Sequence, residues 1–328
     1  MLKLSIVIPV FNEEDVLPEA LKRLSALRGS FPPDVDLEYM FIDDGSKDAS
    51  LSLLEEAAAH DRAVKVLSFS RNFGHQMAIT AGLDMAEGDY VAVIDADLQD
   101  PPELIVEMLD LARREGFDVV YGKRSAREGE TRFKKLTAAV FYRVLKYMCE
   151  IDIPEDTGDF RLMSRRIVNH FKCFRERHRF VRGLVPWLGF SQKPLEYVRQ
   201  KRSAGLTKYP FRKMLAFAVN AVLSFSNKPL TLATRLGFAA LVVAVVGSLV
   251  MLWLKIFTAF TVPGLASSII AMAFFSGIQL LLMGLMGEYI ARIFEEIKQR
   301  PLYIIGRSFN CSSNMPAERH WPDSRSCP

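Results

Sequence analysis

The chain has few cysteines. Only four of its 328 residues are of this type, and their spacing fits neither a metal-ligand cluster nor a redox pair. We therefore expect free thiols in a reducing compartment. The four are Cys149, Cys173, Cys311 and Cys327. A signal peptide is not expected either, because the first apolar run, Leu4 to Val10, is too short and leads directly into a polar stretch.

Acidic residues are absent from the whole stretch between Glu196 and Glu288. Two segments in it, Leu236 to Leu254 and Ser267 to Gly287, carry no charge and are long enough to cross the hydrocarbon core of a bilayer. Thr261-Val262-Pro263-Gly264 between them is typical of a turn. Basic residues flank the outer ends of this pair, whereas the connection holds only one, so the positive-inside rule places both ends in the cytoplasm. The flanking residues are Lys228, Arg235, Arg292, Lys298 and Arg300, and the connecting one is Lys255.

A second membrane feature precedes these spans. Between Pro210 and Ser226, large apolar residues recur at helical spacing, with Arg212 and Lys213 near the start. This pattern predicts an amphipathic helix lying in the membrane interface.

The first half of the chain alternates apolar runs with amphipathic segments, which predicts a doubly wound, mostly parallel α/β sheet. Asn12 is expected to cap the first helix, with Asp15 in its first turn. The predicted strands are Leu4–Val10, Tyr39–Ile42, Val64–Phe69, Asp89–Ile94 and Val119–Tyr121. The helices are expected around Leu51 to Ala58, over Gly74–Glu87 and over Pro101–Glu115.

Polar clusters follow three of these strands: Asn12-Glu13, Asp43-Asp44 and Asp95-Ala96-Asp97. Ligands of such sheets bind beyond the carboxyl ends of the strands, so we expect the clusters to form one site. Two carboxylates at the end of a buried strand suit Mg²⁺ or Mn²⁺ shared with a substrate diphosphate. A solvated turn is the alternative for Asp95 and Asp97, and a turn with a helix cap is the alternative for Asp43 to Ser46.

Several motifs in this order resemble family 2 glycosyltransferases with the GT-A fold, in their polyprenyl-phosphate branch. The similarity extends from about Leu2 to Arg307 and includes bacterial bactoprenol glucosyltransferases and dolichyl-phosphate mannose synthases. The motifs are Val7-Ile8-Pro9-Val10-Phe11-Asn12-Glu13, Asp43-Asp44-Gly45-Ser46, Arg71-Asn72-Phe73-Gly74, Asp95-Ala96-Asp97-Leu98-Gln99-Asp100-Pro101-Pro102, Thr157-Gly158-Asp159-Phe160-Arg161-Leu162, Arg202-Ser203-Ala204-Gly205-Leu206-Thr207-Lys208-Tyr209, Gly287-Glu288-Tyr289-Ile290 and Lys298-Gln299-Arg300-Pro301-Leu302-Tyr303.

The resemblance implies a role for each matching residue. The nucleotide sugar would contact Pro9, Phe11, Glu13, Ile42, Asp44, Asp95, Ala96 and Lys208, and a Mg²⁺ or Mn²⁺ ion would bind Asp95, Asp97 and Gln99. Asp97, Asp159 and Arg124 would serve catalysis. The acceptor phosphate would meet Arg124, Lys134, Lys135 and Arg202.

Two of these roles have alternatives. Asp159 matches a carboxylate often assigned as a base, but a phosphate monoester with a second pKa of about 6 is already a nucleophile. Asp159 would then orient the sugar or the acceptor, or serve structure alone. The basic residues after Tyr121, and Arg202 and Lys208, could equally contact anionic lipid heads.

The resemblance therefore implies inverting transfer of a sugar from a nucleotide donor, UDP-glucose in the first place, to undecaprenyl phosphate at the cytoplasmic face of the bacterial inner membrane. GDP-mannose, UDP-N-acetylglucosamine or a modified arabinose are alternative donors. The expected parts are a catalytic domain (1–198), a basic linker with the interfacial helix (199–231), a two-helix transmembrane hairpin (232–291), a cytoplasmic segment (292–307) and a disordered tail (308–328). The resemblance also implies a homotetramer, and both termini are expected in the cytoplasm.

There are two alternatives, one of the same enzyme class and one of a different class of protein. A processive polysaccharide synthase would carry a Gln-x-x-Arg-Trp motif, but none of Trp187, Trp253 and Trp321 follows an arginine. A non-enzymatic membrane scaffold would have no need of Asp95, Asp97 and Gln99. No nucleic-acid recognition module accompanies the basic loops, so no nucleic-acid partner is expected.

Overall fold

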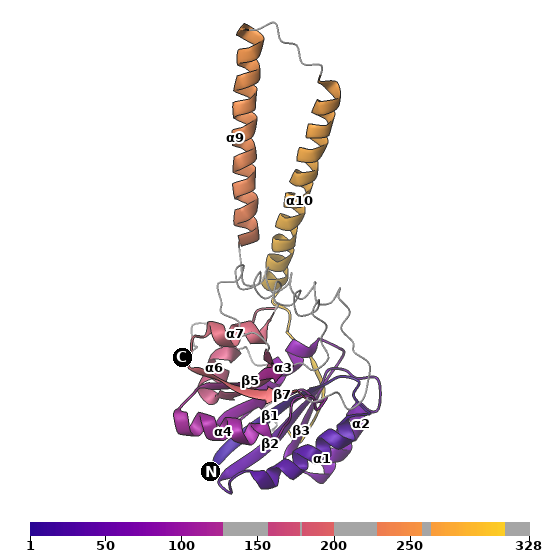
Figure 1. Cartoon of the computed structure of the whole chain (residues 1–328). Coiled ribbons are helices and arrows are strands. Elements are labelled where there is room, and N and C mark those ends of the chain that lie inside the picture. The colour runs from indigo at the N-terminus through magenta and orange to yellow at the C-terminus, as the bar shows by residue number, and fades with distance from the viewer. Residues whose placement is uncertain (127–156, 178, 200–227, 258–263, 312–328) are drawn as a thin grey trace. The chain divides into compact units, whose positions relative to one another are not determined.

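The computed structural model describes residues 1–126, 157–177, 179–199, 228–257 and 264–311. The chain separates into two compact units. The first contains the described residues up to 199 and again from 300 onward, and the second contains two long helices (Figure 1). The predicted interfacial helix falls on residues 200–227, which lie outside the described residues.

A mixed sheet with the strand order β7-β5-β6-β4-β1-β2-β3-β8 forms the centre of the first unit (Figure 1). β1 is parallel to β2 and β4, β2 to β3, and β5 to β7. β6 and β8 are antiparallel to their neighbours. This arrangement confirms the predicted α/β class with a mostly parallel sheet. The strands are β1 (Leu2–Val10), β2 (Val35–Asp43), β3 (Val64–Phe69), β4 (Tyr90–Val93), β5 (Val119–Ala126), β6 (Thr157–Ser164), β7 (Gln192–Val198) and β8 (Ile305–Phe309).

Helices pack on both faces of this sheet. Alternate residues of β1, such as Ile6 and Ile8, share a buried cluster with apolar residues of α1, α2 and α4. The opposite face of β1 meets α3, where a Cβ on Gly82 would overlap Val7, so only glycine permits this approach. The bounds are α1 (Leu17–Leu27), a 3-10 turn η1 (Arg28–Ser30), α2 (Ser50–His60), α3 (His75–Met85), α4 (Leu104–Glu115), α6 (Arg165–Cys173) and α7 (Val181–Trp187).

Three predictions about this unit are wrong. Asn12 does not cap α1, which begins at Leu17 after Val16. Its side-chain oxygen instead accepts a hydrogen bond from the Lys47 amide at 2.9 Å. The tail expected to be disordered from Ser308 continues in strand β8, whose Ser308 and Phe309 pair with β3. The remaining tail, 312–328, lies outside the described residues.

The third wrong prediction concerns the cysteines. Cys173 is disulfide-bonded rather than free. Cys311 is a free thiol, as expected, and burial raises its pKa.

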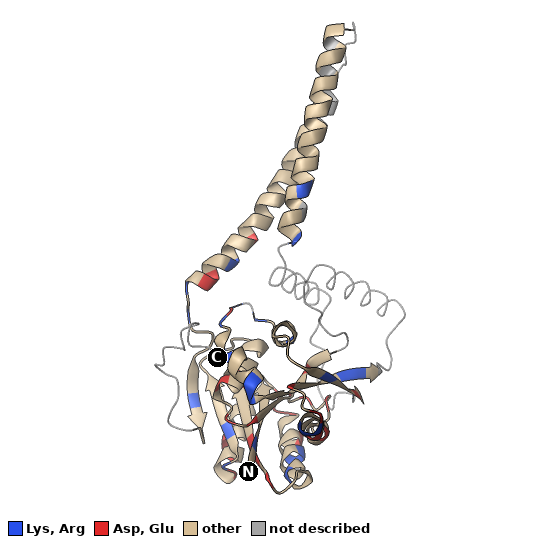
Figure 2. Cartoon of the chain, turned by 90° about the vertical axis from the view of Figure 1, so that its left-hand side faces the viewer, with Lys and Arg blue, Asp and Glu red and all other residues tan. Residues whose placement is uncertain are grey.

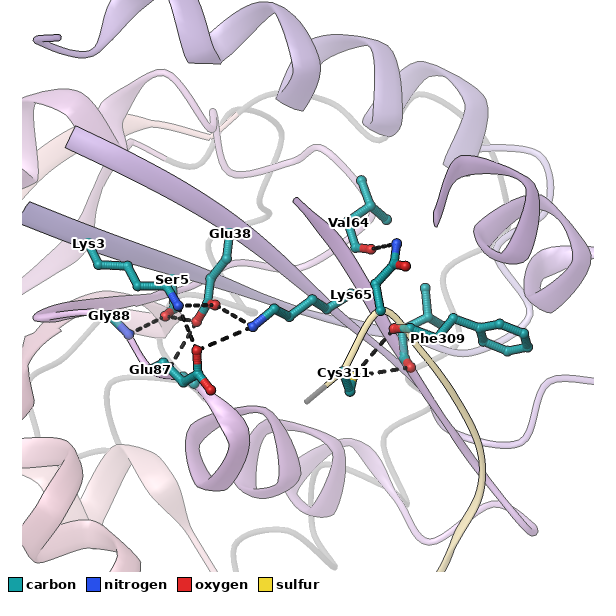
Figure 3. Close-up of polar contacts among 12 residues, drawn as sticks. Lys3, Ser5, Glu38, Val64, Lys65, Glu87, Gly88, Phe309 and Cys311 are labelled. Carbon is teal, nitrogen blue, oxygen red and sulfur yellow. Dashed lines mark hydrogen bonds and ion pairs between the residues drawn. The ribbon is translucent and has the colours of Figure 1, made fainter. Parts of the chain in front are cut away.

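A buried ionic network ties the first three strands together on the α3 side (Figure 3). Glu38 on β2 is 2% exposed, and its carboxylate accepts hydrogen bonds from the Ser5 hydroxyl and from the Glu87 amide at 2.9 Å. Lys65 and Lys3 pair with the second oxygen at 2.8 and 3.0 Å. Each buried charge therefore has an opposite partner, which offsets the cost of removing it from water.

The second unit contains α9 (Lys228–Phe257) and α10 (Leu265–Ile297). The most apolar 18-residue windows of Lys228–Leu254 and Ile270–Ile297 have mean hydropathies of 2.4 and 1.9, and both segments are long and apolar enough to cross a membrane. Each helix has a long uncharged stretch, and the charged residues coloured in Figure 2 lie near the start of α9 and near the end of α10. These helices match the two spans predicted from the sequence.

Candidate active site

The loops after β1, β2 and β4 leave the same, carboxyl edge of the sheet, since these strands are parallel, and they are the candidate site. The loops after β1 and β2 bind each other directly: the Asn12 amide donates to Ser46 Oγ at 3.0 Å and the Glu13 amide donates to Ser50 Oγ at 2.9 Å. Gly45 has a φ of +68°, and a Cβ there would lie 2.5 Å from the carbonyl carbon of Arg71. Glycine is therefore required where these loops meet the segment after β3.

That segment, the Arg71–Gly74 loop, closes around the carboxylate of Asp44. The amides of Phe73 and Gly74 donate to Oδ1 at 2.7 and 3.2 Å. The Asn72 side chain donates to Oδ2 at 2.9 Å. The Arg71 guanidinium lies 4.1 Å from the centre of the Phe73 ring. Two sequence motifs far apart in the chain thus form one polar unit.

Asp44 is 3% exposed, and this burial raises its pKa, although the amides of Phe73 and Gly74 oppose the rise. Because its oxygens already accept several hydrogen bonds, its main role in the described structure is to shape the Arg71–Gly74 loop. Reading of a nucleobase by Asp44 stays a prediction, and a carboxylate retains lone pairs for a further donor.

Asp95 and Asp97 follow β4, as predicted. Oδ1 of Asp95 is buried and has no hydrogen-bond partner among the described residues. His75 lies beside it, with Nε2 3.5 Å from this oxygen. Asp97 Oδ1 accepts the Gln99 amide at 3.1 Å. Burial raises the pKa of Asp95 to about 6, with His75 opposing this rise and neighbouring carboxylates adding to it.

This arrangement fits a divalent cation. A buried carboxylate oxygen without a donor is costly unless a cation binds it. Asp95, Asp97 and the side-chain oxygen of Gln99, the ligands predicted from the sequence, would offer the oxygen donors that Mg²⁺ and Mn²⁺ favour. Within the described residues, no group of three or more His, Cys, Asp and Glu side chains forms a metal site, so the rest of the coordination shell would come from water and substrate.

Asp159 on β6 is 1% exposed and is held from two sides. Arg182 on α7 donates from Nε to Oδ1 and from Nη2 to Oδ2, both at 2.9 Å. His75 Nε2 lies 3.2 Å from Oδ2. Burial raises the pKa of Asp159, but the charge of Arg182 and the hydrogen bond with His75 outweigh it and lower the pKa well below its usual range.

His75 lies between Asp95 and Asp159. Burial lowers its pKa, but its hydrogen bond with Asp159 and the charge of Asp95 are stronger and raise the pKa to about 9. The imidazole is therefore a cation at neutral pH. Asp159 is thus an ionised acceptor within a group of cations, which disfavours the role of a proton-abstracting base.

Another buried carboxylate, that of Asp100, lies beside Arg124, the residue predicted to bind the acceptor phosphate. Asp100 is fully buried and accepts a hydrogen bond from the Tyr197 hydroxyl. Arg124 Nη2 lies 3.7 Å from one oxygen of Asp100 and Arg199 Nε lies 3.6 Å from the other. Arg124 Nε also donates to the Tyr197 hydroxyl at 3.3 Å. Asp100 and Tyr197 thus orient the Arg124 fork at the end of β5.

The other predicted residues are placed as follows. Pro9 and Ile42 are buried neighbours in the paired strands β1 and β2, so both support the sheet. Phe11 is 39% exposed and available to stack on a ligand. Glu13 is partly exposed and Ala96 is buried. Lys134, Lys135, Arg202 and Lys208 lie outside the described residues.

Sequence reasoning missed three members of this site. His75 directly follows the Arg71–Gly74 motif, so its position was a usable signal. Asp100 lies inside the quoted aspartate motif but received no role. Arg182 has no local signal, because its pairing with Asp159 depends on the packing of α7 against β6.

Comparisons with known proteins give one consistent result. The family model described as "Glycosyl transferase family 2" matches residues 5–171. An uncharacterized glycosyltransferase, YkcC, of Bacillus subtilis (strain 168) is 50% identical over 93% of this chain and 94% of its own length. The SfII prophage-derived bactoprenol glucosyl transferase of Shigella flexneri is 41% identical over 94% of this chain and 98% of its own length.

Among solved structures, mannosyl-3-phosphoglycerate synthase from Rubrobacter xylanophilus is similar with a TM-score of 0.48 and 19% identity. That similarity covers 82% of this chain and 80% of the other.

Proposed function

Because the chain belongs to glycosyl transferase family 2, with the GT-A fold that its sequence predicted, we propose that it transfers a sugar from a nucleotide donor to a polyprenyl phosphate. The bactoprenol glucosyl transferase similar to it along nearly its whole length supports this acceptor and favours glucose as the sugar. UDP-glucose is the first donor to test, with undecaprenyl phosphate as the lipid. The reaction is a single displacement with inversion.

The observation that carries the proposal is Asp95 Oδ1, at the carboxyl end of β4, which is buried and has no hydrogen-bond partner in the described part of the chain. Asp95, Asp97 and Gln99 would hold Mg²⁺ or Mn²⁺, which would neutralise the diphosphate that leaves. Asp97→Asn is therefore the variant that removes transfer without touching the sheet.

The acceptor needs no base in this scheme. A phosphate oxygen of the lipid attacks the anomeric carbon, the bond from that carbon to the diphosphate oxygen breaks, and the nucleoside diphosphate departs with the electron pair. The phosphate monoester, with a second pKa of about 6, is largely a dianion at neutral pH. Arg124, oriented by Asp100 and Tyr197, is the residue we assign to that phosphate, since its guanidinium binds phosphate oxygens bidentately.

The remaining donor and acceptor contacts belong to the same proposal. Phe11, Glu13 and Asp44, with Pro9, Ile42 and Ala96 as supporting positions, would line the nucleotide side, and Lys208 would approach the diphosphate. Lys134, Lys135 and Arg202 would add charge on the acceptor side. The role proposed for Asp159 is to orient its cationic neighbours rather than to remove a proton.

We place the reaction at the cytoplasmic face of a bacterial inner membrane. Two candidate spans, with basic residues outside the pair, support this orientation of both termini. There the phosphate of a polyprenyl lipid would be within reach of a soluble nucleotide sugar. We also propose that the protein is a homotetramer, because the family it resembles suggests this state.

A donor screen tests the proposal. The purified full chain, with Mn²⁺ and undecaprenyl phosphate, is incubated in turn with UDP-glucose, UDP-N-acetylglucosamine and GDP-mannose, and the lipid product is read by mass. The expected result is one hexose added from UDP-glucose by the wild type and none by Asp97→Asn. A membrane scaffold without activity would give no lipid product with any donor.

A further inference from the structure

The segment after the second membrane helix returns to the catalytic unit and binds it at several points. We name residues Arg300–Cys311 the C-terminal strap. The Arg300 carbonyl accepts a hydrogen bond from Arg177 at 3.1 Å. Strand β8 in the strap pairs with β3, and the Asn310 side chain donates to the carbonyls of Ala58 and Val64 at 2.6 and 2.9 Å. The strap thus extends the sheet beside β3.

Tyr303 is the most deeply buried contact of the strap, at 8% exposure. Its ring stacks on Phe69 at the end of β3, with centroids 5.2 Å apart and planes at 15°. Its hydroxyl donates to Asp84 of α3 at 2.8 Å. Asp84 is also held by Arg175 through both oxygens, at 2.8 and 3.0 Å. The Tyr303 side chain is therefore locked to β3 and to α3, the two elements that the Arg71–Gly74 loop connects.

From Phe69 the contacts continue into that loop. The Phe69 and Phe73 rings meet edge to face at 5.6 Å. The Ser70 amide donates to the carbonyl of Ile304 in the strap at 3.0 Å. Phe73 and Gly74 then donate their amides to Asp44. An unbroken series of contacts, Tyr303 to Phe69 to Phe73 to Asp44, leads from the strap to the candidate donor site.

We propose that the C-terminal strap is a positioning element of the donor site, with Tyr303 setting the Arg71–Gly74 loop through Phe69 and Phe73. This inference rests on the proposed function insofar as the loop binds the donor. Helix α10 ends at Ile297, so the strap is also the direct continuation of the second candidate span.

Replacement of Tyr303 in the full-length, detergent-solubilised protein tests this proposal. Tyr303→Leu removes the ring stack, whereas Tyr303→Phe keeps the stack and loses only the hydroxyl. Arg307→Ala is the matched control on β8, since Arg307 is exposed and its side chain pairs with Glu55 at 3.4 Å. Hydrogen exchange at the Phe73 and Gly74 amides measures the stability of the Arg71–Gly74 loop and needs no substrate. The KM for the nucleotide sugar measures the effect on the donor site.

We expect exchange at these two amides to become about tenfold faster in Tyr303→Leu, and the donor KM to rise about fivefold with kcat little changed. Tyr303→Phe and Arg307→Ala should match the wild type in both readouts. Unchanged exchange in a folded Tyr303→Leu overturns the proposal whatever the activity. Faster exchange with an unchanged donor KM overturns the link to the donor site.

A variant that does not fold would not end the test. Tyr303→Met fills a similar volume without a ring and adapts to the space, so it should fold and show the same two changes. Wild-type exchange in that variant would equally overturn the proposal. If the wild type transfers no sugar, the proposed function fails, but the exchange readout still decides the role of the strap.

Discussion

Arg182 holds both carboxylate oxygens of Asp159, each at 2.9 Å, and joins α7 to β6 directly at the candidate site. His75 Nε2 lies 3.2 Å from Asp159 Oδ2 and 3.5 Å from Asp95 Oδ1. A carboxylate so paired stays ionised throughout the working pH range, because its pKa lies well below the usual value. Its contribution is therefore to hold two cations in place beside the reacting groups.

Asp159→Asn is expected to lower kcat about 100-fold, since the Arg182 fork loses its bidentate partner and the reacting groups lose alignment. Asp159 itself should contribute no titration between pH 6 and 9, because its carboxylate is ionised throughout that range. Its removal lowers the pKa of His75, so the rate of the variant should fall further as the pH rises toward 9. The measurement is a pH–rate profile of both proteins. Loss of one limb of the profile in the variant would instead identify Asp159 as a base.

Arg124→Lys should raise the KM for polyprenyl phosphate about tenfold, the cost of one charge-assisted hydrogen bond, and leave the donor KM unchanged. Lysine offers a point charge where arginine offers a planar fork. Lys123→Ala is the matched control, since the neighbouring Lys123 points to the other face of β5 and pairs with Glu196 at 3.1 Å. A donor KM that rises with the acceptor KM would contradict this assignment of Arg124.

Gly45→Ala is expected to destabilise the protein by at least about 2 kcal/mol, because a side chain is strained at a φ of +68°. The new Cβ would also press on the Arg71 and Asn72 backbone. Thermal unfolding measures the change. Gly29→Ala serves as control, since a Cβ there meets nothing within 4 Å. Equal melting temperatures for the two variants would refute the close approach of these loops.

The Glu38 network predicts a pH dependence of stability. Burial alone would raise the pKa of Glu38, but hydrogen bonds from Lys65 and Ser5 outweigh it and lower the pKa to about 2, against 4.5 when unfolded. The ionised carboxylate therefore contributes about 3 kcal/mol above pH 4.5. That contribution disappears as the pH falls from 4.5 toward 2.

Glu38→Gln should accordingly be less stable than the wild type at pH 7, by up to the same ~3 kcal/mol. The difference should shrink steadily below pH 4.5. Chemical unfolding at a series of pH values measures it. A gap that is constant from pH 7 to pH 3 would show that the charge of Glu38 does not contribute.

Local patterns were enough to predict the elements that carry strong periodicity. The strand Val64–Phe69 was predicted to the residue, and the aspartates after β4 were assigned to a site because a buried apolar run precedes them. Because β1, β2 and β4 are parallel neighbours, Asn12, Asp44 and Asp95 follow strands that end at the same edge of the sheet. These features follow from burial and strand order alone.

Features that depend on distant pairings were not predicted. Arg182 meets Asp159 only because α7 packs on β6, and nothing near Arg182 in the sequence signals it. Strand β8 is short and lies at the sheet edge, so its pairing with β3 needed the three-dimensional structure. Asn12 has the side chain of a good cap, but its competing bond to Lys47 directs it to the neighbouring loop.

Coupled release of nucleoside diphosphate tests the central claim most directly. Purified full-length protein is incubated with Mn²⁺ and UDP-glucose labelled in the sugar, with and without undecaprenyl phosphate. The amount of UDP released is then compared with the amount of labelled lipid formed. The account predicts UDP release only when the lipid phosphate is present, with one UDP for each hexosyl lipid. UDP release at the same rate without the lipid, or labelled lipid without equivalent UDP, would contradict it.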